Sequence, residues 1–283
     1  MVAKKKKQKK QKIKKRKPTT RRKKKNESFK LPLWIHYVLI GIMIVVFFLA
    51  FYYFFISPYK YRWKKCMGVR AYGVCIPVGN YLHGLDVSRH QGKINWEELS
   101  TTKDSTVSLD FVFIKATEGG DFRDENFNVN FSEAKKAGFI RGVYHYYIPL
   151  TSAKKQAEFF IENVKLQAGD LPPVLDIEVK PKRMNEEELQ DSLKIWLELI
   201  ENHYKVKPIL YTSYKFKSRY LSHLEFEKYP YWIAHYYVDR VRYQGKWQFW
   251  QHTDVGLVPG IKELVDLNVF NGTQEELKGL TIQ

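Results

Sequence analysis

The chain has 283 residues, enough for one ordinary domain with additional short segments. Its net charge of +18 is uneven, because residues 1–30 hold 17 of the 48 Lys and Arg and a single acid, Glu27. The other residues carry 31 basic and 29 acidic side chains, a net charge of +2. A nearly neutral main part argues against a nucleic-acid-binding domain.

The N-terminal tail, residues 1–30, is rich in Lys and Arg and nearly devoid of large apolar side chains. Such a segment cannot bury enough apolar surface to offset its ordering entropy, so we expect a disordered cytoplasmic tail. The apolar segment that follows favours contact of this tail with anionic lipids. Binding of nucleic acid by the tail is the alternative.

An apolar segment follows the tail, with no Asp, Glu, Lys or Arg between Leu31 and Tyr59. A helix needs about 20 such residues to cross the hydrocarbon layer. We therefore expect a transmembrane helix over residues 31–57 that acts as an uncleaved signal anchor. A cleaved signal peptide is the alternative, but residues 57–63 (Ser-Pro-Tyr-Lys-Tyr-Arg-Trp) make a poor cleavage site.

The basic residues around this segment predict its orientation. The N-terminal flank holds 17 of them and residues 60–65 hold four, so the N-terminus should stay in the cytoplasm. We expect a single-pass protein of the bacterial inner membrane, with the main domain in the periplasm or outside the cell.

Residues 58–80, with their Gly and Pro, predict a stalk or entry hairpin. This segment contains Cys66 and Cys75, the only cysteines of the chain. An oxidising compartment lets them form a disulfide, and two free thiols are the alternative.

Residues 81–283 alternate between short apolar runs and amphipathic stretches. Helical spacing of apolar residues covers 151–167 and 185–204, and Asn185 followed by three Glu predicts the start of the second helix. The expected strands cover residues 84–88, 111–116, 140–147, 173–178, 208–212, 232–236, 247–252 and 265–270. This order predicts an α/β domain, an irregular TIM-like barrel of five βα units plus three further strands.

Acidic residues are placed where such barrels carry their chemistry, at the carboxyl ends of the strands. Asp176 and Glu178 stand two apart, so both should project from one face. Mutual repulsion and burial raise one pKa, which suits a general acid for cleaving a glycosidic bond. Asp86 and Asp266 occur within apolar strands, where a carboxylate is costly without a function. A solvated acid pair without function is the alternative.

Aromatic residues gather near the same strand ends, and flat rings can stack on sugars. Core packing is the alternative for each single ring. The residues are Tyr144, Tyr146, Tyr211, Trp232, Tyr236 and Trp250.

Histidines offer no recognisable metal motif. No His-Glu-x-x-His spacing is present, so we expect no metal and treat the histidines as hydrogen-bonding residues. A serine nucleophile elbow and a phosphate-binding glycine loop are absent too, and we expect no cofactor. The histidines concerned are His90, His145, His235 and His252.

Several segments together resemble glycoside hydrolase family 25, the Chalaropsis-type lysozymes, over roughly residues 83–279. They are 84–88 (Gly-Leu-Asp-Val-Ser), 90–92 (His-Gln-Gly), 94–96 (Ile-Asn-Trp), 113–119 (Phe-Ile-Lys-Ala-Thr-Glu-Gly), 176–178 (Asp-Ile-Glu), 250–253 (Trp-Gln-His-Thr) and 265–270 (Val-Asp-Leu-Asn-Val-Phe). The resemblance implies hydrolysis of the β-1,4 bond between N-acetylmuramic acid and N-acetylglucosamine in peptidoglycan.

The resemblance also implies roles. Glu178 would be the general acid, and Asp176 would orient the substrate N-acetyl group, whose oxygen attacks the sugar with retention of configuration. Direct attack by Asp176 stays open. Asp86 and Asp266 would shape the site, and Gln251, within the matched segment 250–253, is expected to bind substrate.

Tethering suggests cell-wall remodelling or catabolism near the membrane of the same cell. Two other functions stay open at this point. One is a hydrolase of chitin-like N-acetylglucosamine chains, and the other is a non-catalytic peptidoglycan-binding barrel.

Overall fold

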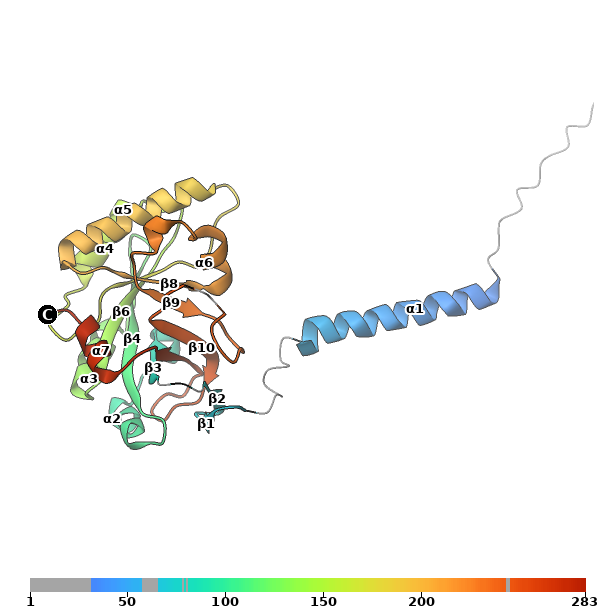
Figure 1. Cartoon of the computed structure of the whole chain (residues 1–283), viewed down its shortest axis with the longest axis horizontal. Coiled ribbons are helices and arrows are strands. Elements are labelled where there is room, and N and C mark those ends of the chain that lie inside the picture. Colours follow the sequence, from blue (N-terminus) through green and yellow to red (C-terminus); the bar gives the residue numbers. More distant parts are fainter. Residues whose placement is uncertain (1–31, 58–65, 78, 80, 243–244) are drawn as a thin grey trace, which may run out of the picture. The chain divides into compact units, whose positions relative to one another are not determined.

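A computed structural model describes residues 32–57, 66–77, 79, 81–242 and 245–283 (Figure 1). It divides into two compact units, Met1–Pro58 and Tyr59–Gln283. The expected disorder of residues 1–30 and their expected lipid contact lie outside the described residues.

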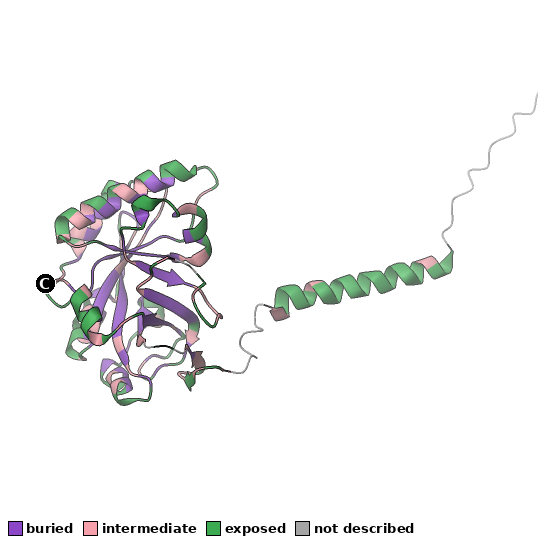
Figure 2. Ribbon diagram, viewed as in Figure 1, coloured by how far each residue is buried: buried purple, intermediate pink, exposed green. Residues whose placement is uncertain are grey.

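The first unit contains the helix α1 (Leu33–Phe51), which continues as a π-helical turn, η1 (Tyr52–Ile56). Together they form 24 residues, within which an 18-residue window has a mean hydropathy of 2.7, and none of their side chains is buried (Figure 2). At 1.5 Å per residue this helix rises about 36 Å, which exceeds the roughly 30 Å hydrocarbon layer of a bilayer. Its length and composition therefore suit a membrane span, and a signal sequence would satisfy the same criterion.

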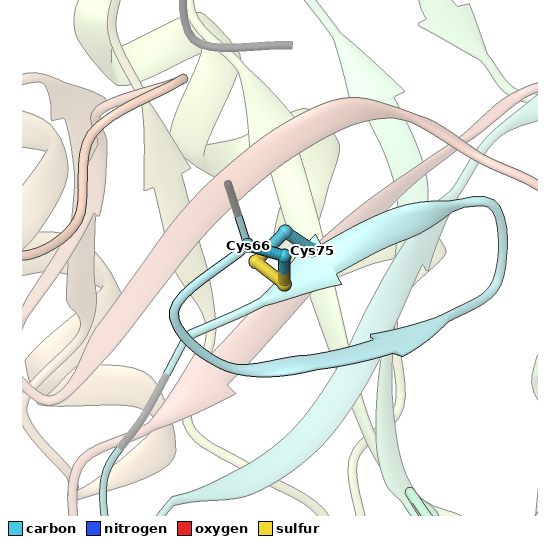
Figure 3. The surroundings of a disulfide bond; sticks show 2 residues. All are labelled: Cys66 and Cys75. Atoms are coloured by element: carbon cyan, nitrogen blue, oxygen red, sulfur yellow. A yellow bond between two sulfur atoms is a disulfide. The ribbon is translucent and has the colours of Figure 1, made fainter. Parts of the chain in front are cut away.

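The second unit begins with an antiparallel hairpin, β1 (Val69–Ala71) and β2 (Val74–Ile76). A disulfide between Cys66 and Cys75 closes it (Figure 3). Tyr72 at the turn links the hairpin to the segment before β4 (Leu109–Glu118), because its hydroxyl donates a hydrogen bond of 2.5 Å to the Val107 carbonyl. Residues 58–65, 78 and 80 of the expected stalk lie outside the described residues.

Within the described part of the chain, eight strands close into a barrel, as predicted. Neighbouring strands run parallel, except that β11 is antiparallel to both of its neighbours, and β3 pairs with β4 to close the ring. In barrel order the strands are β3 (Leu82–Val87), β4 (Leu109–Glu118), β6 (Ile140–Tyr146), β7 (Val174–Asp176), β8 (Ile209–Ser213), β9 (Tyr231–Ala234), β10 (Phe249–Gly256) and β11 (Val265–Phe270). A two-residue strand, β5 (Phe122–Arg123), folds back on the end of β4.

Helices follow most of the strands and surround the sheet (Figure 1). They are α2 (Trp96–Ser100), α3 (Phe127–Lys136), α4 (Ala153–Asn163), α5 (Glu186–Tyr204), α6 (Tyr214–Tyr220) and α7 (Gln274–Leu280). The predicted start of α5 is confirmed, because Asn185 and Glu188 each accept from the other's backbone N–H at 2.8 Å. Helix α4 is shorter than the predicted 151–167, since the backbone is already extended at Val164.

Apolar side chains fill two separate layers. Leu175 and Ile177 pack in the layer between sheet and helices, as predicted. The barrel interior is filled by rings such as Phe113, which stacks on Trp232 with centroids 4.4 Å apart. A side chain at Gly142 would meet the Phe113 ring at 2.5 Å, so glycine makes room for this packing. Side chains fill the barrel interior, so the open space for a site lies at the carboxyl ends of the strands.

Candidate active site

A cavity of about 320 Å³ opens at the carboxyl ends of the barrel strands. All four predicted acids line it, which places residues from β3, β7 and β11 around one space. The lining residues are Asp86, Val87, Ser88, His90, Gln91, Lys115, Tyr144, Tyr146, Asp176, Glu178, Tyr211, Trp232, Tyr236, Gln251 and Asp266.

Asp176 and Glu178 differ sharply in exposure. Asp176 ends β7 and is only 5% exposed, whereas Glu178 follows the strand and is exposed. Burial and then the charge of Glu178 raise the pKa of Asp176 well above its ordinary value. Partial desolvation also raises the pKa of Glu178. The pair can therefore hold a proton at a pH where ordinary carboxyls are ionised.

Lys115 on β4 places a positive charge in the same cavity. Its Nζ lies 2.7 Å from a carboxylate oxygen of Glu118 and 4.9 Å from the centre of the Tyr146 ring. This charge opposes the raised pKa values of Asp176 and Glu178. Lys115 thus offsets part of the negative charge of the acids in the cavity.

A second acid pair, Asp86 and Asp266, is held by amides. Asp86 Oδ2 accepts from Gln251 Nε2 at 2.8 Å and from Asn268 Nδ2 at 2.7 Å. Burial raises the pKa of both acids, and the hydrogen bond between them lowers that of Asp86 while raising that of Asp266. The proton of the pair therefore resides on Asp266, and Asp86 is its acceptor.

Tyrosine and tryptophan residues fix the walls of the cavity. The hydroxyls of Tyr211 and Tyr236 each donate to Gln251 Oε1 at 2.6 Å. The indole of Trp232 donates to Asn268 Oδ1 at 2.8 Å. Both amides thereby turn their N–H groups toward Asp86. Of the predicted rings, Tyr144, Tyr146 and Tyr236 are half-buried at the cavity.

Trp250 is the predicted substrate-binding residue that does not line the cavity. It is fully buried, and its indole N–H donates to the His235 carbonyl at 2.8 Å. Its neighbours on β10, Phe249 and Gln251, face the barrel interior and the cavity, so alternation turns Trp250 to the other side of the sheet. A sugar-stacking role for Trp250 is therefore wrong in this structure.

Sequence reasoning gave no role in the site to several residues that line the cavity or hold its acids. Asn268 stands two residues after Asp266 in a predicted strand, so strand alternation was a signal for it. Lys115 stands two residues after the inward-facing Phe113 on β4, so the same spacing was a signal for it. Ser88, His90 and Gln91 come from the turn after β3, where strand alternation gives no signal, although they stand in the segments that carry the family resemblance.

The histidines considered as ligands are dispersed. His145 is fully buried behind the sheet, where its ring bonds the Thr117 hydroxyl at 2.7 Å and the Gln156 side chain at 3.2 Å. Burial lowers its pKa to about 3, so it stays neutral. His90 alone of the four lines the cavity.

Comparison with known proteins agrees with this geometry. The model of the glycosyl hydrolases family 25 matches residues 85–261. The YegX protein of Escherichia coli (strain CFT073) is 41% identical over 226 residues, 80% of each chain. Lysozyme M1 of Streptomyces globisporus is 32% identical over 213 residues, 70% of this chain and 71% of the relative.

A solved structure supports the same assignment. The family 25 glycosyl hydrolase from Bacillus anthracis superimposes with a TM-score of 0.66 at 32% identity, covering 73% of this chain and 96% of that one. With the barrel and the four acids in place, the chain belongs to glycosyl hydrolase family 25 and is a glycoside hydrolase.

Proposed function

We propose that this hydrolase is a muramidase that cleaves the β-1,4 bond between N-acetylmuramic acid and N-acetylglucosamine in peptidoglycan. The observation that carries the proposal is the convergence of Asp176, Glu178, Asp86 and Asp266 on one cavity. The similarity to a protein named lysozyme supports the choice of substrate.

The difference in exposure between Asp176 and Glu178 assigns them different roles. Glu178 is exposed and accessible to a glycosidic oxygen, so we assign it as the general acid. Asp176 is buried and has no hydrogen-bond partner for Oδ1 among the described residues. A substrate N-acetyl N–H would satisfy this oxygen. That bond favours the ionised form of Asp176, which leaves the proton on Glu178.

The proposed reaction retains configuration through the substrate. The acetamido oxygen forms a bond to the anomeric carbon as the glycosidic bond breaks, and Glu178 gives its proton to the leaving oxygen. Water then opens the cyclic intermediate, with Glu178 taking a proton back. Asp86 and Asp266 shape the site, and the half-buried rings of Tyr144 and Tyr146 bind substrate.

The apolar helix supports a membrane-anchored enzyme. We place the basic N-terminus in the cytoplasm and the hydrolase domain on the outer side of the membrane, where a disulfide such as Cys66–Cys75 persists. Residues 1–30 would lie against anionic lipids. Activity that is recovered free in the medium from intact cells, with an N-terminus beyond residue 57, would favour a cleaved signal peptide instead.

Release of reducing ends from purified peptidoglycan tests the activity, with the full chain in detergent micelles. Glu178→Gln should lower the rate about 100-fold or more, the usual loss when a general acid is removed. Glu263→Gln is the matched control, because Glu263 is exposed and does not line the cavity. Equal rates for both variants would refute the assignment. Faster cleavage of chitin oligosaccharides than of peptidoglycan would refute the substrate.

A further inference from the structure

A second hollow, of about 910 Å³, lies between the segment 92–97 and the helix α3. Its lining shares no residue with the catalytic cavity. The lining residues are Gly92, Lys93, Ile94, Asn95, Trp96, Glu97, Asn126, Val129, Asn130, Glu133 and Lys262.

Two of these residues carry buried donors that lack a partner. Asn130 is 3% exposed and Trp96 is 6% exposed. Asn130 Nδ2 and Trp96 Nε1 have no hydrogen-bond partner among the residues that the structure describes. An unpaired buried N–H costs about 1–3 kcal/mol, so such groups are normally satisfied. Both atoms can only donate, so each lacks an acceptor such as a carbonyl oxygen.

The other lining residues narrow the chemistry of that ligand. Lys93, Lys262 and Glu97 are exposed around the hollow, so both signs of charge are present. The ring of Trp96 packs edge-on against Phe139 and is too buried to serve as a stacking surface for a sugar. Donors for carbonyls combined with charges of both signs suit a zwitterionic peptide better than a bare glycan.

The two hollows are adjacent along the chain. Gln91 lines the catalytic cavity, and the next residue, Gly92, lines the second hollow. Asn126 at the start of α3 donates to the Gly92 carbonyl at 3.3 Å, which holds the two walls together. Consecutive Cα atoms are about 3.8 Å apart, and an extended peptide of four residues reaches about 13 Å. A stem peptide of that length would extend from a sugar in the catalytic cavity toward the second hollow.

We propose that the hollow lined by Trp96, Val129 and Asn130 binds the stem peptide of peptidoglycan, so that the enzyme prefers glycan strands that still carry their peptides. The inference rests on the proposed function, because it assumes that the cleaved glycan is peptidoglycan. The donors Asn130 Nδ2 and Trp96 Nε1 would bind peptide carbonyls, and Lys93, Lys262 and Glu97 would face its charged groups.

The test compares two substrates, intact peptidoglycan and the same material after an amidase has removed its stem peptides. The measured quantity is the ratio of kcat/KM on the first to kcat/KM on the second, for the full chain. Asn130→Leu removes the donor at nearly constant volume, and Val129→Arg fills the hollow from an exposed helix position. Ile195→Arg, at an exposed position of α5, is the matched control.

We expect the wild-type protein and Ile195→Arg to prefer intact peptidoglycan, and each cavity variant to lower the ratio about 10-fold. A wild-type ratio of one, or cavity variants that keep the wild-type ratio, would overturn the peptide site. A loss of equal size on both substrates would overturn it as well, because it would reflect damage to the fold. Failure of the proposed function is a different result, the release of no reducing ends from either substrate.

Discussion

Asp266 and Asp86 lie opposite each other where β11 pairs with β3, and their side chains are hydrogen-bonded. Amide N–H groups of Gln251 and Asn268 support the ionised form of Asp86, so Asp266 keeps the shared proton. One proton between two buried acids gives the site a dependence on pH that is separate from that of the general acid.

This pair should make the folded protein less stable as the pH rises. A folded-state pKa of about 9 for Asp266, against 3.8 for the ordinary group, means that the folded state binds more protons between these values. The contribution of Asp266 to stability is therefore greatest below pH 4 and declines through this window. Asp266→Asn should flatten the decline and raise Tm at pH 8, by about 2–4 °C for each kcal/mol relieved. Calorimetry from pH 4 to 9 measures this, with exposed Asp121→Asn as control. Identical slopes in all three proteins would contradict the assignment.

Lys115 should set the alkaline limit of activity. Its charge lowers the pKa of both Asp176 and Glu178, so its removal by Lys115→Met lets both acids keep their protons to higher pH. The alkaline limb of the kcat/KM profile should shift upward by about one pH unit, as expected for a nearby charge. The exposed Lys165→Met supplies the comparison, and its limb should not move. A downward shift in Lys115→Met would show that the lysine acts by another route.

The disulfide should stabilise the hairpin without affecting catalysis. It closes a loop with a sequence separation of 9, for which chain entropy gives about 2–3 kcal/mol. No residue of β1 or β2 lines the catalytic cavity. The double variant Cys66→Ser/Cys75→Ser should therefore keep the wild-type kcat/KM and gain protease cleavage sites between residues 66 and 77. Limited proteolysis with mass spectrometry measures the cleavage. A kcat/KM that falls as the cleavage rises would contradict the prediction that the disulfide does not affect catalysis.

Trp250 should matter for stability and not for substrate binding. Trp250→Phe removes the donor to the part-buried His235 carbonyl, which should cost about 1 kcal/mol in the free energy of unfolding. KM for peptidoglycan should stay at the wild-type value. Tyr146→Leu, which alters the cavity wall, should raise KM in the same assay. A raised KM in Trp250→Phe, with unchanged stability, would show that Trp250 binds substrate after all.

Strand alternation predicted much of the fold and of the site. The apolar runs located all eight barrel strands, and a spacing of two placed Asp176 and Glu178 at one cavity. Alternation could not place Trp250, because residues 247–252 carry aromatic or amide side chains on both faces of the strand. The second hollow was beyond sequence reasoning, since packing alone brings Lys262 to segment 92–97 and α3.

Gly84 shows how a residue remote from the substrate can govern the chemistry. It pairs with Phe111 where β3 meets β4, and a methyl group there would lie 2.5 Å from the Phe111 carbonyl oxygen. Asp86 stands two residues further along the same strand. Any larger residue at position 84 would push the two strands apart and carry Asp86 away from its amide donors. A mutational survey should therefore find this position as intolerant of change as the acids themselves, although it touches no sugar.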